Sequence, residues 1–275
     1  MNKEELLEKF KEPIKVLDDG FVRLVDVMGD DKAIVDAARI SYGKGTKAVS
    51  TDEALIRYLI RHGHTSPLEM CEIKLHIRIP MDAWRQYIRH RTMSVNEYST
   101  RYSEVIDSAM NTDPGEWRTQ SKDNKQGSDG FLNLKTGEHL SIREEELHAL
   151  SKEIYQERLE AGVAREQARK DIPLCTYTEA YVKVDLNNLM RFLKSRMHLH
   201  AQLEIREYAN TIFRIMSEWV PFSAKAFSDY ILNSYTLSSQ EVDIIRRCLV
   251  GGVDLSPLSK REAKEFSKFF LEERK

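Results

Sequence analysis

The chain has 275 residues, of which 41% are hydrophobic and 31% are charged, and its formal net charge is −2. This composition allows one large domain or two closely joined ones, and the near-neutral charge argues against a protein that coats DNA or RNA. No run of about 18 apolar residues occurs, so we expect no membrane span. The three cysteines are widely spaced and odd in number, which is typical of reduced thiols in a cytoplasmic protein.

The first predicted elements are two helices and a strand. Apolar spacing predicts a short helix over residues 2–11, a strand over residues 21–27 and a helix over residues 31–40. Thr51 is a good N-cap for a further helix, and Gly63 marks the point just beyond its C-terminal end.

Residues 71–79 form the clearest predicted strand. Apolar side chains alternate with polar or charged ones from Cys71 to Ile79. Period two with one polar face indicates an antiparallel strand or an edge strand. Pro80 ends this strand, and Asp82 can cap a helix that runs to about Arg91.

The middle of the chain is polar and rich in turn-forming residues. We predict a long loop or insertion near residues 106–140, which is a candidate for a functional role because structureless loops of this length are uncommon. Ser141 and Glu144 have the spacing of a capping box, so a helix is expected from there to about Ala161. Gly162 breaks that helix.

The C-terminal part is mainly helical. A short helix reaching Lys170 is followed by a predicted strand over residues 177–185, and residues 186–218 have the longest helical pattern in the chain. Two more helices are expected near residues 239–249 and 259–274.

The order of these elements indicates an α+β fold. Strands and helices do not alternate as βα units, so we expect a mostly antiparallel sheet flanked by long helices. We expect a single domain over residues 1–275, with the polar insertion near 106–140 and a helical C-terminal extension near 238–275 to which the sequence assigns no role.

The most informative segment covers residues 89–101. It begins with Arg89-His90-Arg91, continues with an ordered series of hydrogen-bonding side chains and ends with Arg101, and it contains no lysine. Guanidinium groups match phosphate oxygens and imide edges better than ammonium groups do. We therefore interpret the segment as a binding strip for a phosphorylated, planar ligand such as a nucleotide.

A second signal lies in the long predicted helix. Leu189, Leu193, Arg196, His200 and Leu203 share one face at helical spacing. A buried arginine is costly unless it is paired, so Arg196 either forms a structural ion pair, extends its head to water at the core edge, or faces a cavity that holds an anionic ligand.

Three other functions are possible for the polar residues. A metal-dependent hydrolase could use His64, His76 and His200, although a continuous helix would point His198 and His200 in different directions. Cys175 resembles a nucleophile, but no basic residue adjoins it and a small buried thiol is the simpler interpretation. Arg89 and His90, together with nearby tyrosines, could contact RNA, which the near-neutral net charge disfavours.

The motifs resemble those of the flavin-dependent thymidylate synthase family. The family motif is R-H-R followed by seven residues and a serine, with Asn-Glu shortly before the serine; Arg89-His90-Arg91, Asn96-Glu97 and Ser99 satisfy it, and Arg101 follows. The resemblance extends to the segment His62-Gly63-His64-Thr65-Ser66-Pro67 and to Arg196 with His200-Ala201-Gln202. It covers roughly residues 21–221.

The resemblance implies a reaction and an assembly. It implies reductive methylation of dUMP to dTMP, with methylenetetrahydrofolate as carbon donor, FAD as redox cofactor and NADPH as reductant, and without a covalent enzyme nucleophile. It also implies a homotetramer whose active sites are shared between subunits. With the cytoplasmic location, the near-neutral charge and the lack of a long apolar run noted above, we expect no nucleic-acid or membrane partner.

The resemblance further implies the site residues. By its motifs, the FAD-contacting positions are Ser66, Arg89, His90, Arg91 and Glu97, and the dUMP-contacting positions are Gln86, Arg89, Glu97, Ser99, Thr100, Arg101, Arg169 and Arg196. Asp185, Asn187 and Arg191 occupy the stretch that contacts the flavin's adenosine end, where family members often have Asn-x-Arg and a later Asn or His. Arg196 is the catalytic candidate, because a permanent cation can stabilise negative charge on a polarised uracil ring.

Overall fold

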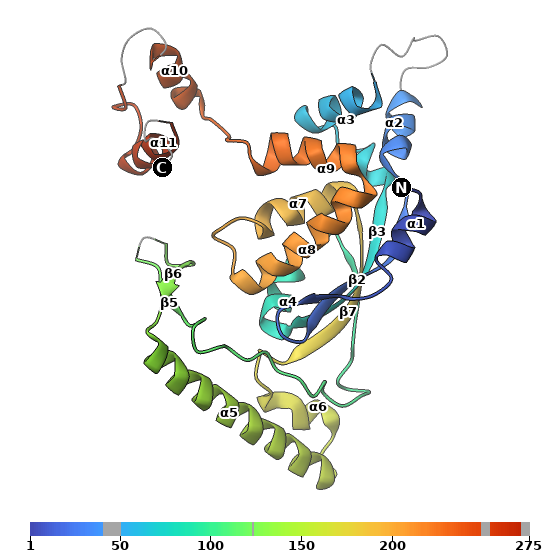
Figure 1. Ribbon diagram of the computed structural model, residues 1–275, viewed down its shortest axis with the longest axis vertical. Coiled ribbons are helices and arrows are strands. Elements are labelled where there is room, and N and C mark those ends of the chain that lie inside the picture. The colour runs from blue at the N-terminus through green and yellow to red at the C-terminus, as the bar shows by residue number, and fades with distance from the viewer. Residues whose placement is uncertain (41–50, 123, 249–253, 271–275) are drawn as a thin grey trace. The chain divides into compact units, whose positions relative to one another are not determined.

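The computed structural model describes residues 1–40, 51–122, 124–248 and 254–270 (Figure 1). The chain divides into two compact units, residues 1–232 and residues 233–275. The sequence predicts one domain with a helical extension, and the expected extension makes up most of the second unit. Within the ranges that the structure describes, no helix is both long and apolar enough to cross a bilayer.

A five-stranded antiparallel sheet forms the centre of the first unit. Its strands follow the order β1-β2-β3-β7-β4. The strands are β1 (Ile14–Val16), β2 (Gly20–Met28), β3 (Glu72–Pro80), β7 (Tyr177–Asp185) and β4 (Ser94–Glu97). Strand β3 pairs with β2 on one side and with β7 on the other, so it is a central strand. The antiparallel α+β fold expected from the sequence is confirmed.

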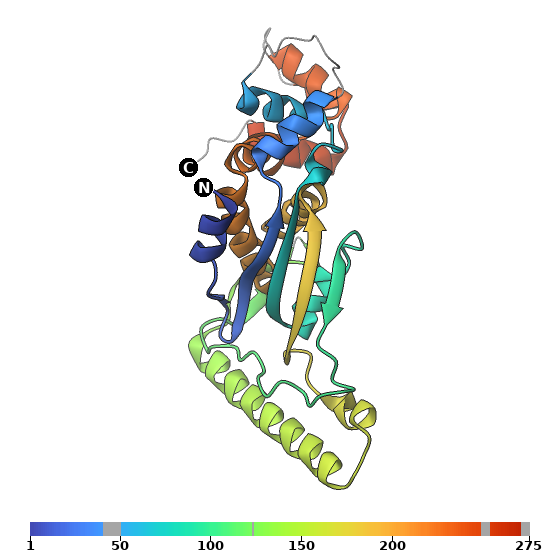
Figure 2. The ribbon, with the colours of Figure 1, turned by 90° about the vertical axis from the view of Figure 1, so that its right-hand side faces the viewer.

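Alternation along β3 gives the sheet two unlike faces. Ile73, Leu75, Ile77 and Ile79 are fully buried, whereas the polar residues between them are partly exposed. The apolar face packs against helices, and Figure 2 views the sheet from the polar face that those helices leave open. Burial of one face therefore fixes the register, because a one-residue slip would turn the isoleucines to solvent.

Helices cover the apolar face of the sheet and the ends of its strands. Thr51 caps the third helix as the sequence predicts, whereas the caps of the first two helices, Asn2 and Asp30, were not predicted. Gly63 has the left-handed backbone (φ +67°) expected just beyond a helix end. The helices of the first unit are α1 (Lys3–Lys9), α2 (Asp31–Arg39), α3 (Asp52–Arg61), α4 (Met81–Tyr87), α5 (Leu134–Glu160), α6 (Arg165–Ala168), α7 (Leu186–Arg196), α8 (Leu203–Trp219) and α9 (Pro221–Phe227).

The second unit contains α10 (Ser239–Cys248) and α11 (Lys260–Phe270). Its described part has a small apolar cluster of its own, in which Ile244, Leu258 and Phe266 are buried. The two helices predicted near the C-terminus are therefore confirmed.

The expected long helix over residues 186–218 is wrong, because the chain breaks between α7 and α8. Helix α7 ends at Arg196, and a turn closed by a hydrogen bond from Ala201 N to His198 O (2.8 Å) leads into α8. Leu199 in this turn is 83% exposed. A continuous helix would have carried both Arg196 and His200 along the buried stripe, whereas the break leaves His200 at the surface.

The expected loop near residues 106–140 is also only partly correct. It contains a two-stranded hairpin, β5 (Arg118–Gln120) and β6 (Ser128–Phe131), and α5 begins at Leu134 with Asn133 as its N-cap. Gly137 in the first turns of α5 allows the loop to approach closely, since a Cβ there would lie 1.8 Å from Pro114 O.

The capping-box signature at Ser141 and Glu144 has a different cause. Ser141 Oγ accepts a hydrogen bond from Trp117 Nε1 (3.0 Å) and donates one to Thr112 O (2.6 Å). Glu144 accepts hydrogen bonds from the backbone N (2.6 Å) and the hydroxyl (3.2 Å) of Thr112. These side chains anchor the insertion to the middle of α5 instead of starting a helix.

Candidate functional site

The Arg-rich strip begins where α4 ends and continues along the edge of the sheet. Helix α4 follows directly from β3 and stops at Tyr87, which places Arg89-His90-Arg91 in a turn. Strand β4 then pairs with β7 and is exposed along its length. Glu97 on β4 accepts a hydrogen bond from Thr178 Oγ1 on β7 (2.9 Å), which fixes the carboxylate at the sheet edge.

Arg196, His90 and Gln86 form a first cluster, which we call the Arg196 cluster. Arg196 Nε donates to His90 Nε2 (3.2 Å), and Arg196 Nη2 donates to the backbone oxygen of Gln86 (3.0 Å). The guanidinium lies near the C-terminal end of α4, where a helix favours a positive charge. The rings of His90 and Phe192 make a T-shaped contact at 5.0 Å between their centroids.

The electrostatics of this cluster favour a neutral histidine and a cation without a counter-ion. Burial lowers the pKa of His90, and the positive charges of Arg196 and Arg191 lower it further. A neutral His90 can accept the hydrogen bond from Arg196 Nε. Burial also lowers the pKa of Arg196 from its ordinary value. Among the described residues no carboxylate pairs with Arg196, so its charge is available to a ligand.

Gln86 connects the Arg196 cluster to the start of α8. Its side-chain amide donates to Gln202 Oε1, and Gln202 Nε2 donates to Asp82 Oδ2 (2.9 Å). Gln202 and Asp82 were not among the sequence-predicted site residues. The signal for Gln202 is its place in the His200-Ala201-Gln202 segment, but only the fold reveals that it contacts Gln86, 116 residues away.

Thr100, Arg101 and Arg169 form a second cluster, which we call the Arg101 cluster. Arg169 lies in a 3₁₀ turn (Arg169–Asp171) after α6, and its Nη1 donates to Thr100 Oγ1. Arg101 Nη2 forms an ion pair with Glu166 Oε2 (3.0 Å), and both side chains are more than half exposed. Ser99 begins the turn, since its carbonyl accepts from Tyr102 N (3.1 Å).

Arg158 on α5 positions the Arg101 cluster, and the sequence did not indicate this role. Its Nη1 donates to Ala168 O (3.0 Å), and its Nη2 pairs with Asp171 Oδ2 (2.6 Å). These two contacts bracket Arg169 on both sides. The long helix α5 therefore supports the turn that presents Arg169.

A cavity of about 200 Å³ lies between the end of α3 and α7. It has an apolar floor and a polar rim, and the rim carries two cations, Arg191 and Lys194. The residues that line the cavity are Leu59, Ile60, Gly63, His64, Thr65, Leu68, Asn187, Met190, Arg191, Lys194, Phe227 and Ile231. The structure therefore brings Asn187 and Arg191 of α7 next to His64 and Thr65.

The remaining predicted cofactor residues lie outside this lining. Ser66 is exposed in the turn that follows Thr65. Asp185 is the N-cap of α7 and accepts hydrogen bonds from the backbone N (2.9 Å) and the side-chain amide (2.6 Å) of Asn188. Arg89 and Arg91 are exposed in the turn after α4 and form no ion pair with another residue in the part of the chain that the structure covers.

The three histidines of the metal hypothesis have other partners. His76 Nε2 contacts Glu179 Oε2 (2.8 Å), and the His76 ring stacks on Tyr181 at 4.8 Å. His200 Nδ1 contacts the side-chain amide of Asn124 (2.6 Å), and His64 packs against Tyr58. Across the described ranges, no group of three or more His, Cys, Asp or Glu residues is arranged to hold a metal ion.

Comparison with known proteins gives consistent matches over most of the chain. The family model described as thymidylate synthase complementing protein matches residues 23–222. The flavin-dependent thymidylate synthase of Ruegeria pomeroyi is 49% identical over 261 residues, which cover 91% of this chain and 85% of that protein. The flavin-dependent thymidylate synthase of Rickettsia conorii is 45% identical over 282 residues and covers 96% of each chain.

A solved structure has the same fold. The UMP/dUMP methylase PolB from Streptomyces cacaoi, bound with 5-Br dUMP, superimposes with a TM-score of 0.72 at 30% sequence identity. The match covers 81% of this chain and 100% of that one. A second structure of PolB, bound with 5-Br UMP, matches with the same TM-score at 31% identity.

Proposed function

The chain belongs to the flavin-dependent thymidylate synthase family, and on that premise we propose that it methylates dUMP to dTMP. We propose methylenetetrahydrofolate as the carbon donor, FAD as the redox cofactor and NADPH as the reductant. The names of the relatives support the flavin, and the PolB complex with a dUMP analogue supports the nucleotide substrate. The alternative of a metal-dependent hydrolase receives no support.

The observation that carries the proposal is the state of Arg196. Its guanidinium is half-buried, bonds only to a neutral imidazole nitrogen and a carbonyl oxygen, and has no carboxylate partner among the described residues. A desolvated cation held in this way stabilises negative charge on a bound ring, because it need not reorganise when that charge develops. We propose that Arg196 polarises the uracil ring of dUMP in this manner.

The Arg101 cluster supports binding of the nucleotide phosphate. Arg101 and Arg169 offer guanidinium forks beside the hydroxyl groups of Ser99 and Thr100, a donor set that suits a phosphate dianion. The exposed ion pair of Arg101 with Glu166 contributes little stability, so a phosphate can replace the carboxylate. Gln86 and Glu97 are proposed to contact the same substrate from α4 and β4.

The residues near the 200 Å³ cavity fit a dinucleotide flavin. An apolar floor suits a flat ring, and cationic groups on the rim suit a diphosphate. We propose that Arg191 and Asn187 hold the adenosine end, and that Ser66, Arg89, His90, Arg91 and Glu97 contact the remainder of FAD. Asp185 acts there through its cap on α7. The bound reduced flavin supplies the hydride for the methylation.

The proposed reaction requires no enzyme nucleophile. Ser99 Oγ accepts a hydrogen bond from Arg101 N (3.4 Å), and no histidine base is bonded to it within the described residues. The buried thiol of Cys71 has a pKa raised to about 12, because burial disfavours the thiolate. These features suit a serine that holds the nucleotide and cysteines that take no part in the methylation.

We propose a homotetramer whose active sites draw residues from more than one subunit. The Arg196 cluster lies between α4 and α7, whereas the Arg101 cluster rests on α5 and the turn after α6, a different part of the unit (Figure 1). Four large apolar side chains on α5 are more than half exposed, which suits a helix that another subunit covers: Leu134, Ile142, Leu147 and Leu150.

Two measurements test the proposed function. The purified protein should be yellow, with the visible absorbance of a bound flavin. It should also release tritium from dUMP that carries the label on the ring carbon to be methylated, in the presence of methylenetetrahydrofolate and NADPH. A colourless protein that binds no added flavin, or one that releases no tritium with all components present, would contradict the proposal.

A further inference from the structure

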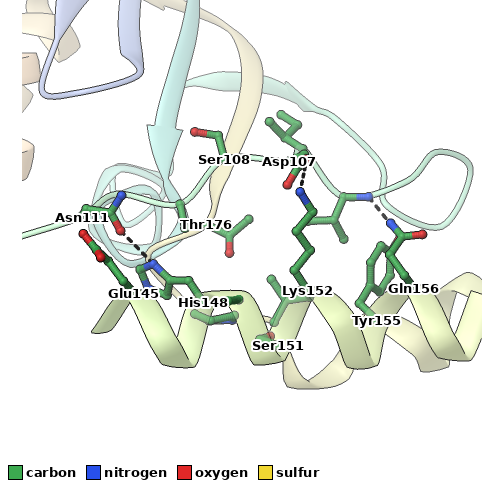
Figure 3. Close-up of a pocket in the computed structure, with 16 residues that line it drawn as sticks. Asp107, Ser108, Asn111, Glu145, His148, Ser151, Lys152, Tyr155, Gln156 and Thr176 are labelled. Atoms are coloured by element: carbon green, nitrogen blue, oxygen red, sulfur yellow. Dashed lines mark hydrogen bonds and ion pairs between the residues drawn. The ribbon is translucent and has the colours of Figure 1, made fainter. Parts of the chain in front are cut away.

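A second cavity lies between α5 and the start of the insertion. It has a volume of about 400 Å³, and Figure 3 shows side chains of α5 facing the extended segment that contains Asp107, Ser108 and Asn111. None of the residues assigned above to dUMP or FAD lines it. The proposed reaction therefore leaves this cavity without a role.

Cys175, His148 and Asn111 form a hydrogen-bonded thiol–imidazole–amide chain beside this cavity. His148 Nδ1 contacts Asn111 Oδ1 (2.9 Å), and Cys175 Sγ contacts His148 Nε2 (3.0 Å). Since an amide oxygen only accepts, Nδ1 carries the imidazole hydrogen, and Nε2 is the atom that accepts the thiol proton. His148 and Asn111 line the cavity, and the neighbouring Thr176 does too (Figure 3).

The three groups come from separate elements that backbone contacts hold together. Met110 N donates to Cys175 O (2.9 Å), and Ala109 pairs with Thr176 as an antiparallel bridge. Asn111 N donates to Asp18 Oδ2 (3.1 Å). The insertion is therefore fixed against the segment of Cys175, and this places Asn111 where it orients the imidazole of α5.

The surroundings keep the resting thiol protonated. Burial, and to a smaller extent the carboxylates of Glu144, Asp82 and Asp18, raise the pKa of Cys175 to about 11. The other charged groups at the cavity are Glu145 and an ion pair between Lys152 and Asp107 (2.6 Å). A thiol in this field becomes a nucleophile when a base removes its proton during the attack.

We propose that Cys175 is a reactive thiol that uses His148 as its base, and that the adjoining cavity admits a small disulfide. The Cys175 sulfhydryl gives its proton to His148 Nε2 while the sulfur attacks one sulfur of the disulfide. A new S–S bond joins Cys175 to that sulfur, and the old S–S bond breaks. The departing thiolate leaves with the electron pair and takes the proton back from His148. Cys175 is oxidised and the leaving thiol is the reduced product.

A sulfur electrophile fits this site better than an acyl group does. Acyl transfer needs hydrogen-bond donors, most often backbone N–H groups, aimed at the developing oxyanion. The two N–H groups that follow the thiol are occupied, since Thr176 N donates to Pro173 O (3.1 Å) and Tyr177 N donates to Ser108 O (2.9 Å). Disulfide exchange places no charge on a carbonyl oxygen, so it requires only the base, the thiol and room for the reagent.

The test is disulfide exchange on the intact protein with dithiobis-nitrobenzoate, followed by peptide mapping under non-reducing conditions. At neutral pH, Cys175 should react at least about tenfold faster than the buried Cys71. His148→Gln should slow the modification of Cys175 by roughly a hundredfold. Its residual reaction should rise only at alkaline pH, where the thiol ionises unaided. Added imidazole should restore part of the rate in His148→Gly.

Matched variants separate this mechanism from a general change in accessibility. His139→Gln alters another histidine of α5, more than two helical turns before His148, and should react like the wild type. Cys175→Ser should remove the fast phase altogether. The proposal is overturned if His148→Gln reacts at the wild-type rate, or if mapping finds the label on Cys248 while Cys175 remains unmodified.

Discussion

Arg196 and Arg101 are both guanidinium groups associated with the strip of residues 89–101, yet their surroundings are opposite. Arg196 is half-buried and bonds to two neutral acceptors, whereas Arg101 is 61% exposed and pairs with Glu166. The first arrangement keeps a positive charge out of water without neutralising it. The second keeps a charge in water and satisfies it with a partner that a substrate can displace.

This difference assigns distinct tasks to the two clusters. An unneutralised charge in a partly desolvated site acts strongly on the electrons of a nearby ring, because water screens it little. An exposed ion pair is screened by water and contributes only about 0–1 kcal/mol to stability, so a substrate phosphate can readily replace its carboxylate. We infer that the Arg196 cluster serves the chemical step and that the Arg101 cluster serves substrate binding.

The largest expected effect follows from Arg196→Ala. Because this change removes a cation that acts mainly on the transition state, kcat for dTMP formation should fall by about a hundredfold or more, with a smaller change in KM for dUMP. Steady-state kinetics with saturating folate and reductant would measure both constants. Arg214→Ala on the exposed face of α8 is the matched control and should retain wild-type kinetics. If Arg196→Ala instead raises KM strongly and leaves kcat unchanged, the Arg196 cluster serves substrate binding and our assignment of it to the chemical step is wrong.

The next effect belongs to Arg101→Ala. A lost charge-assisted hydrogen bond to phosphate removes about 1.5–3 kcal/mol, so KM for dUMP should rise tenfold or more while flavin binding stays intact. Calorimetric titration with dUMP and a flavin titration would separate the two. Glu166→Gln frees Arg101 from its partner and should leave dUMP affinity equal or slightly tighter. Equal loss of nucleotide and flavin in Arg101→Ala would contradict this assignment.

His90 in the Arg196 cluster should make the stability of the protein depend on pH. The pKa of His90 in the folded protein lies below its ordinary value, so the unfolded chain binds the proton first as the pH falls. The stability of the wild type should therefore decrease as the pH drops through and below the ordinary histidine range. His90→Asn lacks the titrating imidazole. The difference in unfolding free energy between the wild type and this variant should therefore become smaller toward acid pH. Denaturant titrations at several pH values would show this narrowing, and a constant difference would contradict it.

The smallest expected effect concerns the support from α5. Arg158→Met removes two contacts that bracket Arg169, so KM for dUMP should rise a few-fold with little change in kcat. Arg143→Met, which removes only an exposed pair with Glu146 on the same helix, is the control and should match the wild type. If Arg158→Met lowers only kcat and leaves KM unchanged, Arg158 does not support substrate binding through the Arg101 cluster.

The sequence predicted those parts of the fold that depend on local patterns. Alternation in residues 71–79 and 177–185 indicated two strands, and both are present as an antiparallel pair; the alternating burial expected for the first strand is also present. The predicted helix cap at Thr51 and the helix end at Gly63 also depended only on neighbouring residues, and both are present. The break after Arg196 was not predicted, because the helical spacing of apolar residues continues through the turn that follows α7.

The sequence predicted the site less completely. The motif over residues 89–101 indicated a nucleotide strip because its residue types suffice for that inference. The partners that hold the strip lie far away in sequence: Arg196 is 106 residues from His90, and Arg169 is 69 residues from Thr100. Cys175 was interpreted as an inert thiol because its base, His148, lies 27 residues earlier on another element. Such contacts depend on the fold and not on spacing.

The central claim is that Arg196 acts on the uracil ring of dUMP, and tritium release from labelled dUMP at saturating nucleotide tests it most directly. At saturation, binding differences no longer affect the rate, so the assay reports the chemistry at the ring. We predict that Arg101→Ala releases tritium at nearly the wild-type rate, whereas Arg196→Ala loses the release almost completely. Wild-type release from a flavin-loaded Arg196→Ala protein would contradict the claim.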